Sequence, residues 1–278
     1  MKIMLVNLKE ILEIAEKGKF AVPAFNTYNM ETVMGVAEAA GELKAPVILQ
    51  SYSRLFNSDC GYYLSSVILA AAKKARVPVC FHLDHGASIA EVTRGIRCGC
   101  SGIMLDASKL PLDENIQATK EVAALCANAG IPVEGELGHI GSVNDESLDE
   151  FTKVEEAKRF TAETGVAALA IMVGTAHGRY KKAPKVDIRR IADIKKEVGV
   201  ALVLHGGSGI PDEQLQAAVR AGIRKVNFGT DVCYSFLDRV FDTSRDLVAI
   251  DLFMKGPVES VKKFAAEKIK LLEAGGKA

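Results

Sequence analysis

The sequence predicts an α/β fold, a (β/α)8 TIM barrel with extra N- and C-terminal helices, and two observations lead to this prediction. Eight short apolar runs recur along the 278 residues, and a segment of helical length follows each run. The runs are nearly continuous in apolar residues, as is typical of parallel strands buried on both faces. No linker or charge block interrupts the eight βα units, so a single domain is expected over residues 1–278. The alternative, a doubly wound open sheet, rarely contains eight evenly spaced parallel strands.

Each expected element is defined by its apolar run or by its helix-end residues. The strands are expected at residues 20–25, 46–51, 77–83, 102–106, 132–137, 167–173, 201–205 and 225–229. Between them stand residues that favour helix starts or stops, namely Asn29, Ser88, Asp113 and Asp212 before helices and Gly130 and Gly222 after them. Additional helices are expected over residues 8–18 and 257–275. The second has an apolar stripe, which favours packing on the barrel over a dimer contact and consists of Val258, Val261, Phe264 and Ile269.

The composition excludes several classes of protein. With 49% hydrophobic and 25% charged residues, the chain is too apolar for a disordered protein and too charged for a membrane bundle. Lys+Arg and Asp+Glu both total 35, so no basic field exists to bind nucleic acid. No apolar run approaches the roughly 20 residues of a membrane span, and no signal peptide is apparent. The six cysteines are therefore expected to be buried, reduced thiols of a cytoplasmic protein.

Histidines gather at the predicted C-terminal ends of strands, where barrel enzymes place their chemistry. His85, His177 and His205 follow the third, sixth and seventh strands. A single histidine is more often an ordinary hydrogen-bonded residue than a ligand. Three at equivalent strand ends favour a Zn²⁺ site with an open coordination position. His82 lies within the third strand and is expected to pack in or near the barrel.

Carboxylates stand beside these histidines. Asp84 directly precedes His85, and two roles remain open for it: orienting a metal-ligating imidazole, or acting as an acid/base toward a metal-bound substrate. Asp106 and Glu136 follow the fourth and fifth strands. They form either an acidic second metal position or a hydrogen-bonded pair at the barrel mouth.

Two glycine-rich turns predict a phosphate site. HGGSG (205–209) follows the seventh strand and NFGTD (227–231) the eighth, and both run into helices. Glycines allow the backbone to approach an anion closely, and helix N-termini present free N–H groups to it. The hydroxyls of Ser208 and Thr230 strengthen the prediction, and a third turn, VGTAHG (173–178), follows the neighbouring strand.

Seven motifs together resemble the class II, zinc-dependent ketose-bisphosphate aldolases, which include fructose- and tagatose-bisphosphate aldolases. They are VPAFN (22–26), HLDHG (82–86), MLDAS (104–108), VEGELG (133–138), GTAHGRY (174–180), LHGGSGI (204–210) and NFGTD (227–231). The resemblance implies reversible aldol cleavage of a ketose 1,6-bisphosphate, fructose 1,6-bisphosphate first, to dihydroxyacetone phosphate and glyceraldehyde 3-phosphate. No lysine Schiff base is then required. The resemblance also implies a role in carbohydrate metabolism such as glycolysis, and it implies that the protein forms a homodimer or homotetramer.

The resemblance also implies roles for individual residues. His85, His177 and His205 would hold Zn²⁺, Glu136 and Asp106 would provide a second or resting metal position, and Asp84 would be the acid/base. The substrate and its ketone-side phosphate would be bound by Asn26, Gly178, Lys181, Gly206, Gly207, Ser208, Asn227, Gly229 and Thr230. A monovalent cation, Na⁺ or K⁺, would lie near the phosphate. Loop 138–151 resembles the family's proton-exchange loop, but Asn144 stands where the family has Glu. Asp145 or Glu146 would have to substitute.

Three departures from the family lie on the substrate side. Gly229 stands where many fructose-specific members have Asp, and QSYSRLF (50–56) stands where the family often has a Gln-Val-Ser-Glu-like stretch after the second strand. AIDLFMKGP (249–257) lacks the Arg that can reach a second phosphate in many members. The cations that could compensate are Arg54, Arg179, Lys181 and Lys255. Tagatose 1,6-bisphosphate and a ketose 1-phosphate without a distal phosphate therefore remain alternative substrates. A zinc hydrolase would carry His-x-His on its first strand, which here ends in AFN, and a non-catalytic barrel would have lost zinc histidines.

Overall fold

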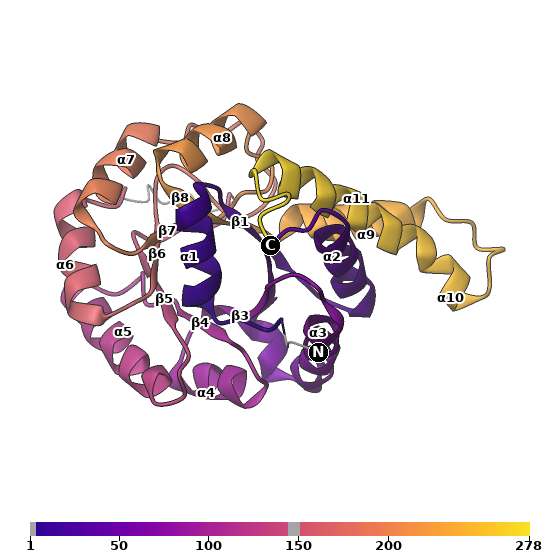
Figure 1. The fold of residues 1–278 in the computed structure, drawn as a ribbon, viewed down its shortest axis with the longest axis horizontal. Coiled ribbons are helices and arrows are strands. Elements are labelled where there is room, and N and C mark those ends of the chain that lie inside the picture. The colour runs from indigo at the N-terminus through magenta and orange to yellow at the C-terminus, as the bar shows by residue number, and fades with distance from the viewer. Residues whose placement is uncertain (1–3, 144–150) are drawn as a thin grey trace.

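A computed structural model describes residues 4–143 and 151–278 and confirms the predicted (β/α)8 barrel. Eight parallel strands close in chain order, with β8 paired to β1 (Figure 1). The strands are β1 (Val22–Asn26), β2 (Val47–Tyr52), β3 (Val79–Gly86), β4 (Gly102–Leu105), β5 (Val133–Leu137), β6 (Ala168–Ile171), β7 (Ala201–Leu204) and β8 (Ile223–Phe228). They match the expected runs to within a few residues, and β3 extends three residues beyond its predicted end.

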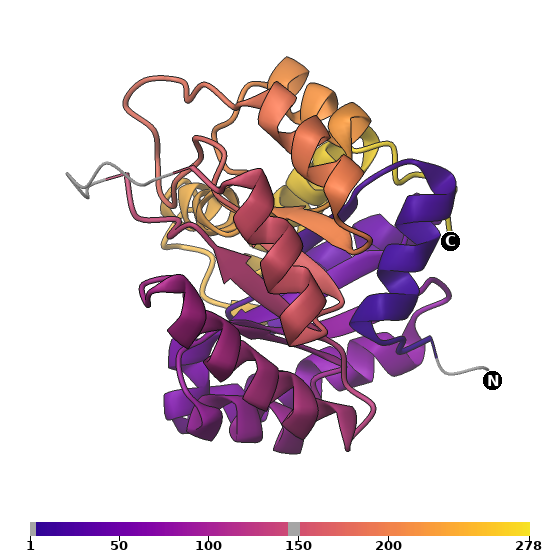
Figure 2. The ribbon, with the colours of Figure 1, turned by 90° about the vertical axis from the view of Figure 1, so that its left-hand side faces the viewer.

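Helices surround the strands (Figure 2). The alternating helices are α2 (Met30–Glu42), α3 (Asp59–Lys74), α4 (Ile89–Arg97), α5 (Leu112–Ala127), α6 (Val154–Thr164), α7 (Ile188–Glu197) and α8 (Asp212–Ala221), with a 3-10 turn, η1 (Ser53–Asn57), before α3. The added helices are α1 (Leu8–Gly18) at the N-terminus and α9 (Thr230–Phe241), α10 (Ile250–Phe253) and α11 (Lys255–Leu271) at the C-terminus. Helix α1 lies across one end of the barrel, where Leu8 meets the first residue of β4, so the opposite end holds the carboxyl termini of the strands (Figure 1).

The predicted helix starts are right for two helices and wrong for two. The side chains of Asn29 and Ser88 accept hydrogen bonds from backbone N–H groups in the first turns of α2 and α4. Asp113 and Asp212 are not N-caps, because α5 and α8 each begin directly after a proline that takes the N-cap position. Their carboxylates lie instead in the first turn, where negative charge interacts favourably with the helix dipole. Gly222 ends α8 as predicted, but α5 ends at Ala127, before Gly130.

The cysteines depart in part from expectation. None of the six, all of which lie in the described ranges, forms a disulfide. Cys80, Cys100 and Cys126 are buried, but Cys60 is exposed, and Cys98 and Cys233 are partly exposed. The prediction of buried thiols was therefore wrong for Cys60 and, in part, for Cys98 and Cys233. No helix within residues 4–143 and 151–278 combines the length and apolarity needed to cross a bilayer.

The C-terminal helix packs along the barrel, as its apolar stripe predicts. Val261 and Ile269 of α11 are fully buried, and α11 lies against α2 and α9. This packing is close, because a Cβ atom at Gly35 of α2 would lie 2.7 Å from the Val258 carbonyl oxygen and 2.9 Å from Val261 Cβ. At the other end, α9 and α10 project from the barrel with the start of α11 (Figure 1). We call residues 230–258 the arm.

Replacing Gly35 with Ala should destabilise the protein by about 1–3 kcal/mol, since backbone and Cβ atoms of α11 must move to admit the added methyl group. Gly41 of the same helix is the matched control, because no atom lies within 4 Å of a Cβ built there. Gly41→Ala should leave stability unchanged or raise it by up to about 1 kcal/mol. Urea unfolding at one protein concentration measures both. Equal free energies of unfolding for the two variants would contradict the close α2–α11 contact.

Candidate active site

A cavity of about 440 Å³ opens at the carboxyl ends of the strands. It brings together ten of the residues singled out in the sequence: Asn26, Asp84, His85, His177, Gly178, Gly206, Ser208, Asn227, Gly229 and Thr230. Lys181 is exposed and is not among its lining residues, and neither is Gly207. Asp145 and Glu146 lie outside the described residues.

An irregularity in β3 turns two successive side chains toward this cavity. In a regular strand, successive side chains point to opposite faces of the sheet. The register with β4 shifts between Leu83 and Gly86, and His85 has φ +51°, an uncommon conformation for a residue other than glycine. Bulges of this kind re-aim side chains next to active sites. As a result, Asp84 and His85 both line the cavity.

The three predicted histidines converge. Their ring centroids are 4.8–5.8 Å apart, and one ring nitrogen from each lies within 4.8 Å of the other two. His85 Nε2 and His205 Nδ1 face each other at 3.0 Å. One ring nitrogen of each histidine has a partner outside the cluster: Asp106 Oδ2 for His85 Nδ1 (2.8 Å), the Ile140 carbonyl oxygen for His177 Nδ1 (3.0 Å) and Glu134 Oε1 for His205 Nε2 (2.8 Å). Such partners fix the orientation of metal-ligating imidazoles.

The protonation of the cluster follows from burial and neighbouring charge. Burial, aided by charge on His85, lowers the pKa of His177 to about 4 and holds the pKa of His205 well below its usual value. Both rings are therefore neutral at physiological pH and keep a lone pair for a metal. Burial also lowers the pKa of His85, but the charge of Asp84 and the hydrogen bond to Asp106 outweigh it and raise that pKa to about 9. A metal bound here must displace this proton.

The predicted acidic pair shares His85 with the histidine cluster. His85, Asp106 and Glu136 form a second group whose potential ligand atoms lie within 4.8 Å of one another. Burial and the charge of Asp106 raise the pKa of Glu136 to about 8. Among the described residues, no hydrogen-bond partner reaches the buried Glu136 Oε2, which lies 3.8 Å from His205 Nδ1. A divalent cation fits this donor set, since it would supply the positive charge that the carboxylate lacks.

Amide groups hold the Asp84 carboxylate from two sides. Asn26 Nδ2 donates to Asp84 Oδ2 at 2.7 Å, and Asn227 Nδ2 donates to Asp84 Oδ1 at 3.2 Å. Gln50 Nε2 in turn donates to Asn26 Oδ1 at 2.8 Å, so strands β1, β2, β3 and β8 all contribute to this chain. The carboxylate lies 4.0 Å from His85 Nε2 and is close enough to act on a substrate bound by the histidine cluster.

The glycine-rich turns meet on one side of the cavity. Gly206 has φ +66°, and a Cβ atom there would lie 2.3 Å from the Ala176 carbonyl oxygen, so the two loops approach only because this residue is glycine. Helix α9 begins at Thr230, which lines the cavity, and its N-cap residue Gly229 has no side chain to accept from the N–H groups of the first turn. The Ser208 hydroxyl accepts from the Asp231 N–H at 3.1 Å. Such groups are suited to an anion, and we call Gly178, Gly206, Ser208 and Thr230 the anion-binding corner.

Two of the remaining candidates contribute to packing. A Cβ atom at Gly229 would lie 3.2 Å from Asn26 Oδ1 and 3.5 Å from the Tyr28 hydroxyl, so Tyr28 occupies space that a larger residue at 229 would need. The Gly207 N–H donates to the Asn227 carbonyl oxygen at 3.0 Å, which ties the loop after β7 to β8.

Several residues of the site were missed in the sequence. Lys225 is fully buried, and its Nζ lies 2.8 Å from Oε2 of Glu134, the residue that bonds His205. Its alternation with Asn227 along β8 was an available signal, because every second residue of a barrel strand faces the same side. Further residues at the cavity that the sequence did not single out come from the end of β2 and from loops, where no periodicity marks them: Tyr28, Tyr52, Lys109, His139, Gly141 and Ser142. Arg54, considered in the sequence as a compensating cation, also lines the cavity. His82, predicted to pack in the barrel, is fully buried.

Comparison with known proteins agrees with the resemblance. The chain is 33% identical to the YdjI aldolase from Escherichia coli K12, with a TM-score of 0.90 over 99% of this chain and 100% of that one. It is 26% identical to a putative fructose-1,6-biphosphate aldolase from Coccidioides immitis, with a TM-score of 0.91 over 98% and 97%. Fructose-bisphosphate aldolase from Campylobacter jejuni, 21% identical, shares the fold with a TM-score of 0.86 over 100% and 98%.

The profile of the family described as fructose-bisphosphate aldolase class-II matches residues 6–277. This match spans nearly the whole chain and confirms the family that the seven motifs predicted. The chain belongs to the class-II fructose-bisphosphate aldolase family.

Proposed function

We propose that this family member reversibly cleaves a ketose 1,6-bisphosphate, fructose 1,6-bisphosphate first, to dihydroxyacetone phosphate and glyceraldehyde 3-phosphate. One observation carries the proposal: a single cavity holds three convergent histidines, a carboxylate held by two amides, and an anion-binding corner. A metallohydrolase would share the histidines but has no need of an anion-binding corner beside them. A non-catalytic barrel would not require the histidines, the carboxylate or the anion-binding corner.

The histidine cluster supports Zn²⁺ as the metal, with His85, His177 and His205 as its ligands and the His85, Asp106 and Glu136 group as a second or resting position. When bound, the metal polarises the ketone carbonyl and stabilises the negative charge that develops as C3–C4 breaks. A monovalent cation, Na⁺ or K⁺, is proposed beside the phosphate from family resemblance. The carbonyls of Ala176 and Gly206, which both accept from the Tyr180 hydroxyl (2.8 and 3.1 Å), are candidate ligands for it.

Asp84 is proposed as the acid/base. In cleavage its carboxylate accepts the proton of the C4 hydroxyl while the C4–O bond becomes the aldehyde carbonyl. The electron pair of the C3–C4 bond passes to C3 and onto the ketone oxygen. A proton must then reach C3 to complete dihydroxyacetone phosphate, and Asp145 or Glu146 is proposed to supply it. Asn26 and Asn227 orient Asp84, and Asn227 is also proposed to contact the dihydroxyacetone portion.

The anion-binding corner is proposed to hold the ketone-side phosphate. Gly178, Gly206, Ser208 and Thr230 line the cavity and offer backbone N–H groups, hydroxyls and the N-terminus of α9. Gly207 and Gly229 keep the surrounding backbone close, and Lys181 is proposed to contribute charge from the exposed loop after β6. The corner is common to any ketose 1-phosphate, so tagatose 1,6-bisphosphate and a ketose 1-phosphate without a distal phosphate remain candidate substrates.

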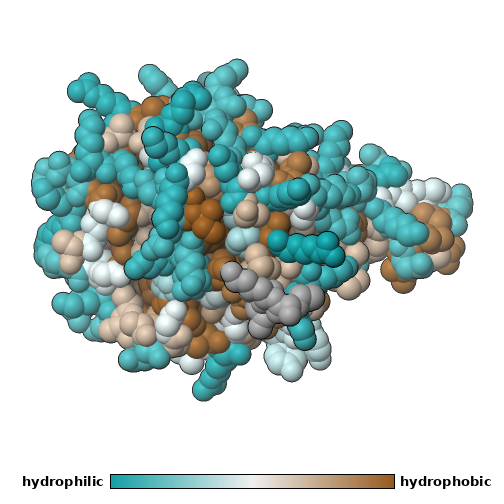
Figure 3. Space-filling model, viewed as in Figure 1, coloured by the Kyte–Doolittle hydropathy of each residue, from teal (hydrophilic) through white to brown (hydrophobic). Residues whose placement is uncertain are grey.

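We also propose that the protein is a cytoplasmic homodimer or homotetramer and that the arm forms the contact between copies. The arm exposes large apolar side chains: Tyr234, Leu237, Phe241, Leu247, Val248, Ile250 and Leu252. Figure 3 shows a hydrophobic patch at the projecting end of the molecule. At the base of the arm, an apolar groove between α2 and α3 is lined in part by Met30, Met34 and Val67. Two-fold pairing would cover patch and groove together, since each copy contributes both.

Replacing His177 with Ala should lower zinc affinity by about 10²-fold or more, because even changes to the groups behind a ligand cost about 10–100-fold. His139→Ala is the control, since His139 lines the same cavity but lies outside the convergent cluster. Metal analysis after dialysis against a weak chelator measures the zinc retained. Full zinc occupancy in His177→Ala would remove this residue from the site.

Asp84→Ala should retain zinc but lose C–C cleavage by about 10²-fold or more, the usual scale for a positioned acid/base. Release of dihydroxyacetone phosphate from fructose 1,6-bisphosphate, coupled to its enzymatic reduction, provides the rate, and metal analysis the zinc content. Asp59→Ala, which removes a surface carboxylate on α3, should match the unaltered protein. If zinc is lost together with activity, Asp84 acts through the ligands and not on the substrate.

Changing both Phe241 and Val248, which are 80% and 82% exposed, to Glu should weaken self-association. A central apolar contact is worth about 2 kcal/mol or more, so the dissociation constant should rise about 30-fold or more for each change. Leu125→Glu on α5, far from the arm, is the control. Sedimentation velocity over a range of concentrations measures the association. A monomeric parent protein, or an oligomer that the double change does not affect, would contradict the role of the arm.

A further inference from the structure

Two cationic side chains line the cavity on the side away from the anion-binding corner. They are Arg54, in η1 directly after β2, and Lys109, in the loop after β4. Among the described residues, neither forms an ion pair with a carboxylate. Cations left available inside a substrate cavity indicate a negatively charged ligand.

Aromatic rings hold Arg54 in place. Its guanidinium carbon lies 5.1 Å from the centre of the Tyr52 ring and 5.9 Å from that of Tyr28. The Tyr52 ring also approaches the site, since its centroid is 5.7 Å from that of His85. Stacking on a ring face occupies the plane of a guanidinium and leaves the N–H donors at its edge available. Arg54 is therefore positioned one ring away from a proposed metal ligand, with its donors free for an anion.

Barrel topology sets the direction in which a substrate extends. In a closed barrel of eight strands, strands four apart in order face each other, so β2 faces β6 and β4 faces β8. The anion-binding corner consists of residues after β6, β7 and β8, and the two cations follow β2 and β4. The histidine cluster lies between these sides. A ketose whose 1-phosphate occupies the corner therefore extends its other end toward Arg54 and Lys109.

The other candidate cations lie elsewhere. Arg179 stacks on Tyr234 of α9, with its guanidinium carbon 4.8 Å from the ring centre. Lys181 is exposed outside the cavity, and Lys255 begins α11 on the arm. Of the four cations considered in the sequence as replacements for the missing Arg, only Arg54 lines the cavity.

Building on the proposed aldolase function, we propose that Arg54 and Lys109 form a subsite for a negatively charged group, phosphate or carboxylate, at the end of the substrate remote from the 1-phosphate. A guanidinium binds either anion through paired N–H donors, and an ammonium adds a point charge. The two residues thus determine specificity for the aldehyde portion and take no part in bond cleavage.

The test uses the zinc-loaded protein in the condensation direction, with dihydroxyacetone phosphate saturating. Three aldehydes of equal carbon number differ only at the far end: glyceraldehyde 3-phosphate, tartronate semialdehyde and glyceraldehyde, which end in phosphate, carboxylate and hydroxyl. At least one anionic aldehyde should exceed glyceraldehyde in kcat/KM by about 10-fold or more. The better of the two anions identifies the natural group. A preference for glyceraldehyde over both would overturn the subsite.

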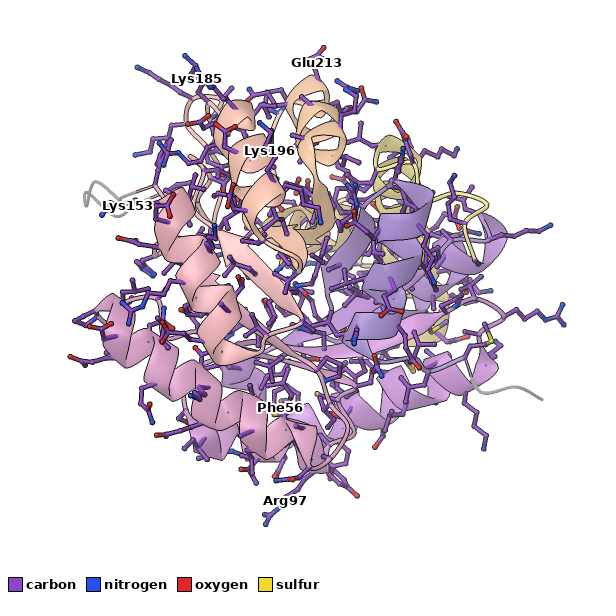
Figure 4. The ribbon with its side chains drawn as sticks, turned by 60° about the vertical axis from the view of Figure 1, so that its left-hand side comes forward. Phe56, Arg97, Lys153, Lys185, Lys196 and Glu213 are labelled. Atoms are coloured by element: carbon purple, nitrogen blue, oxygen red, sulfur yellow. The ribbon has the colours of Figure 1, made fainter. Side chains whose placement is uncertain are left out.

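The variants Arg54→Gln and Lys109→Met test whether each residue belongs to the subsite. Each should lower kcat/KM for the preferred anionic aldehyde by about 10–10²-fold, mainly through KM, and for glyceraldehyde by less than about 3-fold. Arg54→Lys should restore part of the loss. The control is Arg97→Gln, because Arg97 points away from the barrel on α4 and should leave all three rates unchanged (Figure 4).

The outcomes separate the two proposals. Equal losses for all three aldehydes in Arg54→Gln and Lys109→Met would show a structural role and overturn the subsite, while the aldolase activity stands. Condensation that fails with every aldehyde in the parent protein would instead overturn the proposed function, on which the subsite depends.

Discussion

The C-terminal ends of all eight strands meet at one rim because the sheet is parallel and closes on itself, and every feature of the site depends on this constraint. His85, His177 and His205 are separated by many residues along the chain, yet their rings approach to within 6 Å because β3, β6 and β7 end at the same level. The irregularity in β3 adds a second condition. It presents Asp84 beside His85, so that the proposed acid/base group and a proposed metal ligand enter the cavity from one strand.

Beneath the rim, buried charged side chains pair with one another and with the histidines. Lys225 and Glu134 pair in the barrel at 2.8 Å, and Glu134 also bonds His205, so a cation of β8 fixes an imidazole of β7 through a carboxylate of β5. Above them, Asp106 holds His85 and the Ile140 carbonyl holds His177. Breaking a buried pair leaves an uncompensated charge, so these contacts restrain the rings strongly. Glu136 remains without a balancing charge: within residues 4–143 and 151–278 its buried Oε2 has no hydrogen-bond partner, and its pKa is raised, so this position suits a positive charge.

The two ends of the cavity are built from different groups, backbone at one end and side chains at the other. The anion-binding corner after β6, β7 and β8 depends on backbone, with glycines that allow loops to touch and a helix N-terminus that supplies N–H groups. The far end after β2 and β4 depends on side chains, with Arg54 stacked on Tyr52 and Tyr28. A backbone site suits a group that all the proposed substrates share, namely the 1-phosphate. A side-chain site can change from one relative to another without altering the barrel, which is the general basis of specificity in this fold.

The sequence by itself determined the eight βα units, the strand-end histidines, Asp84 and the glycine-rich turns, because hydrophobic periodicity and short motifs are local properties. It misplaced the starts of α5 and α8, where proline competes with Asp for the N-cap, and the exposure of Cys60. Only the tertiary structure decided that Lys225 supports Glu134 and His205, that Tyr28 occupies the space beside Gly229, and that Arg54 reaches the cavity while Arg179 stacks on Tyr234. These contacts join residues from different strands and loops, so their distances depend on barrel closure and loop path, which no local pattern encodes.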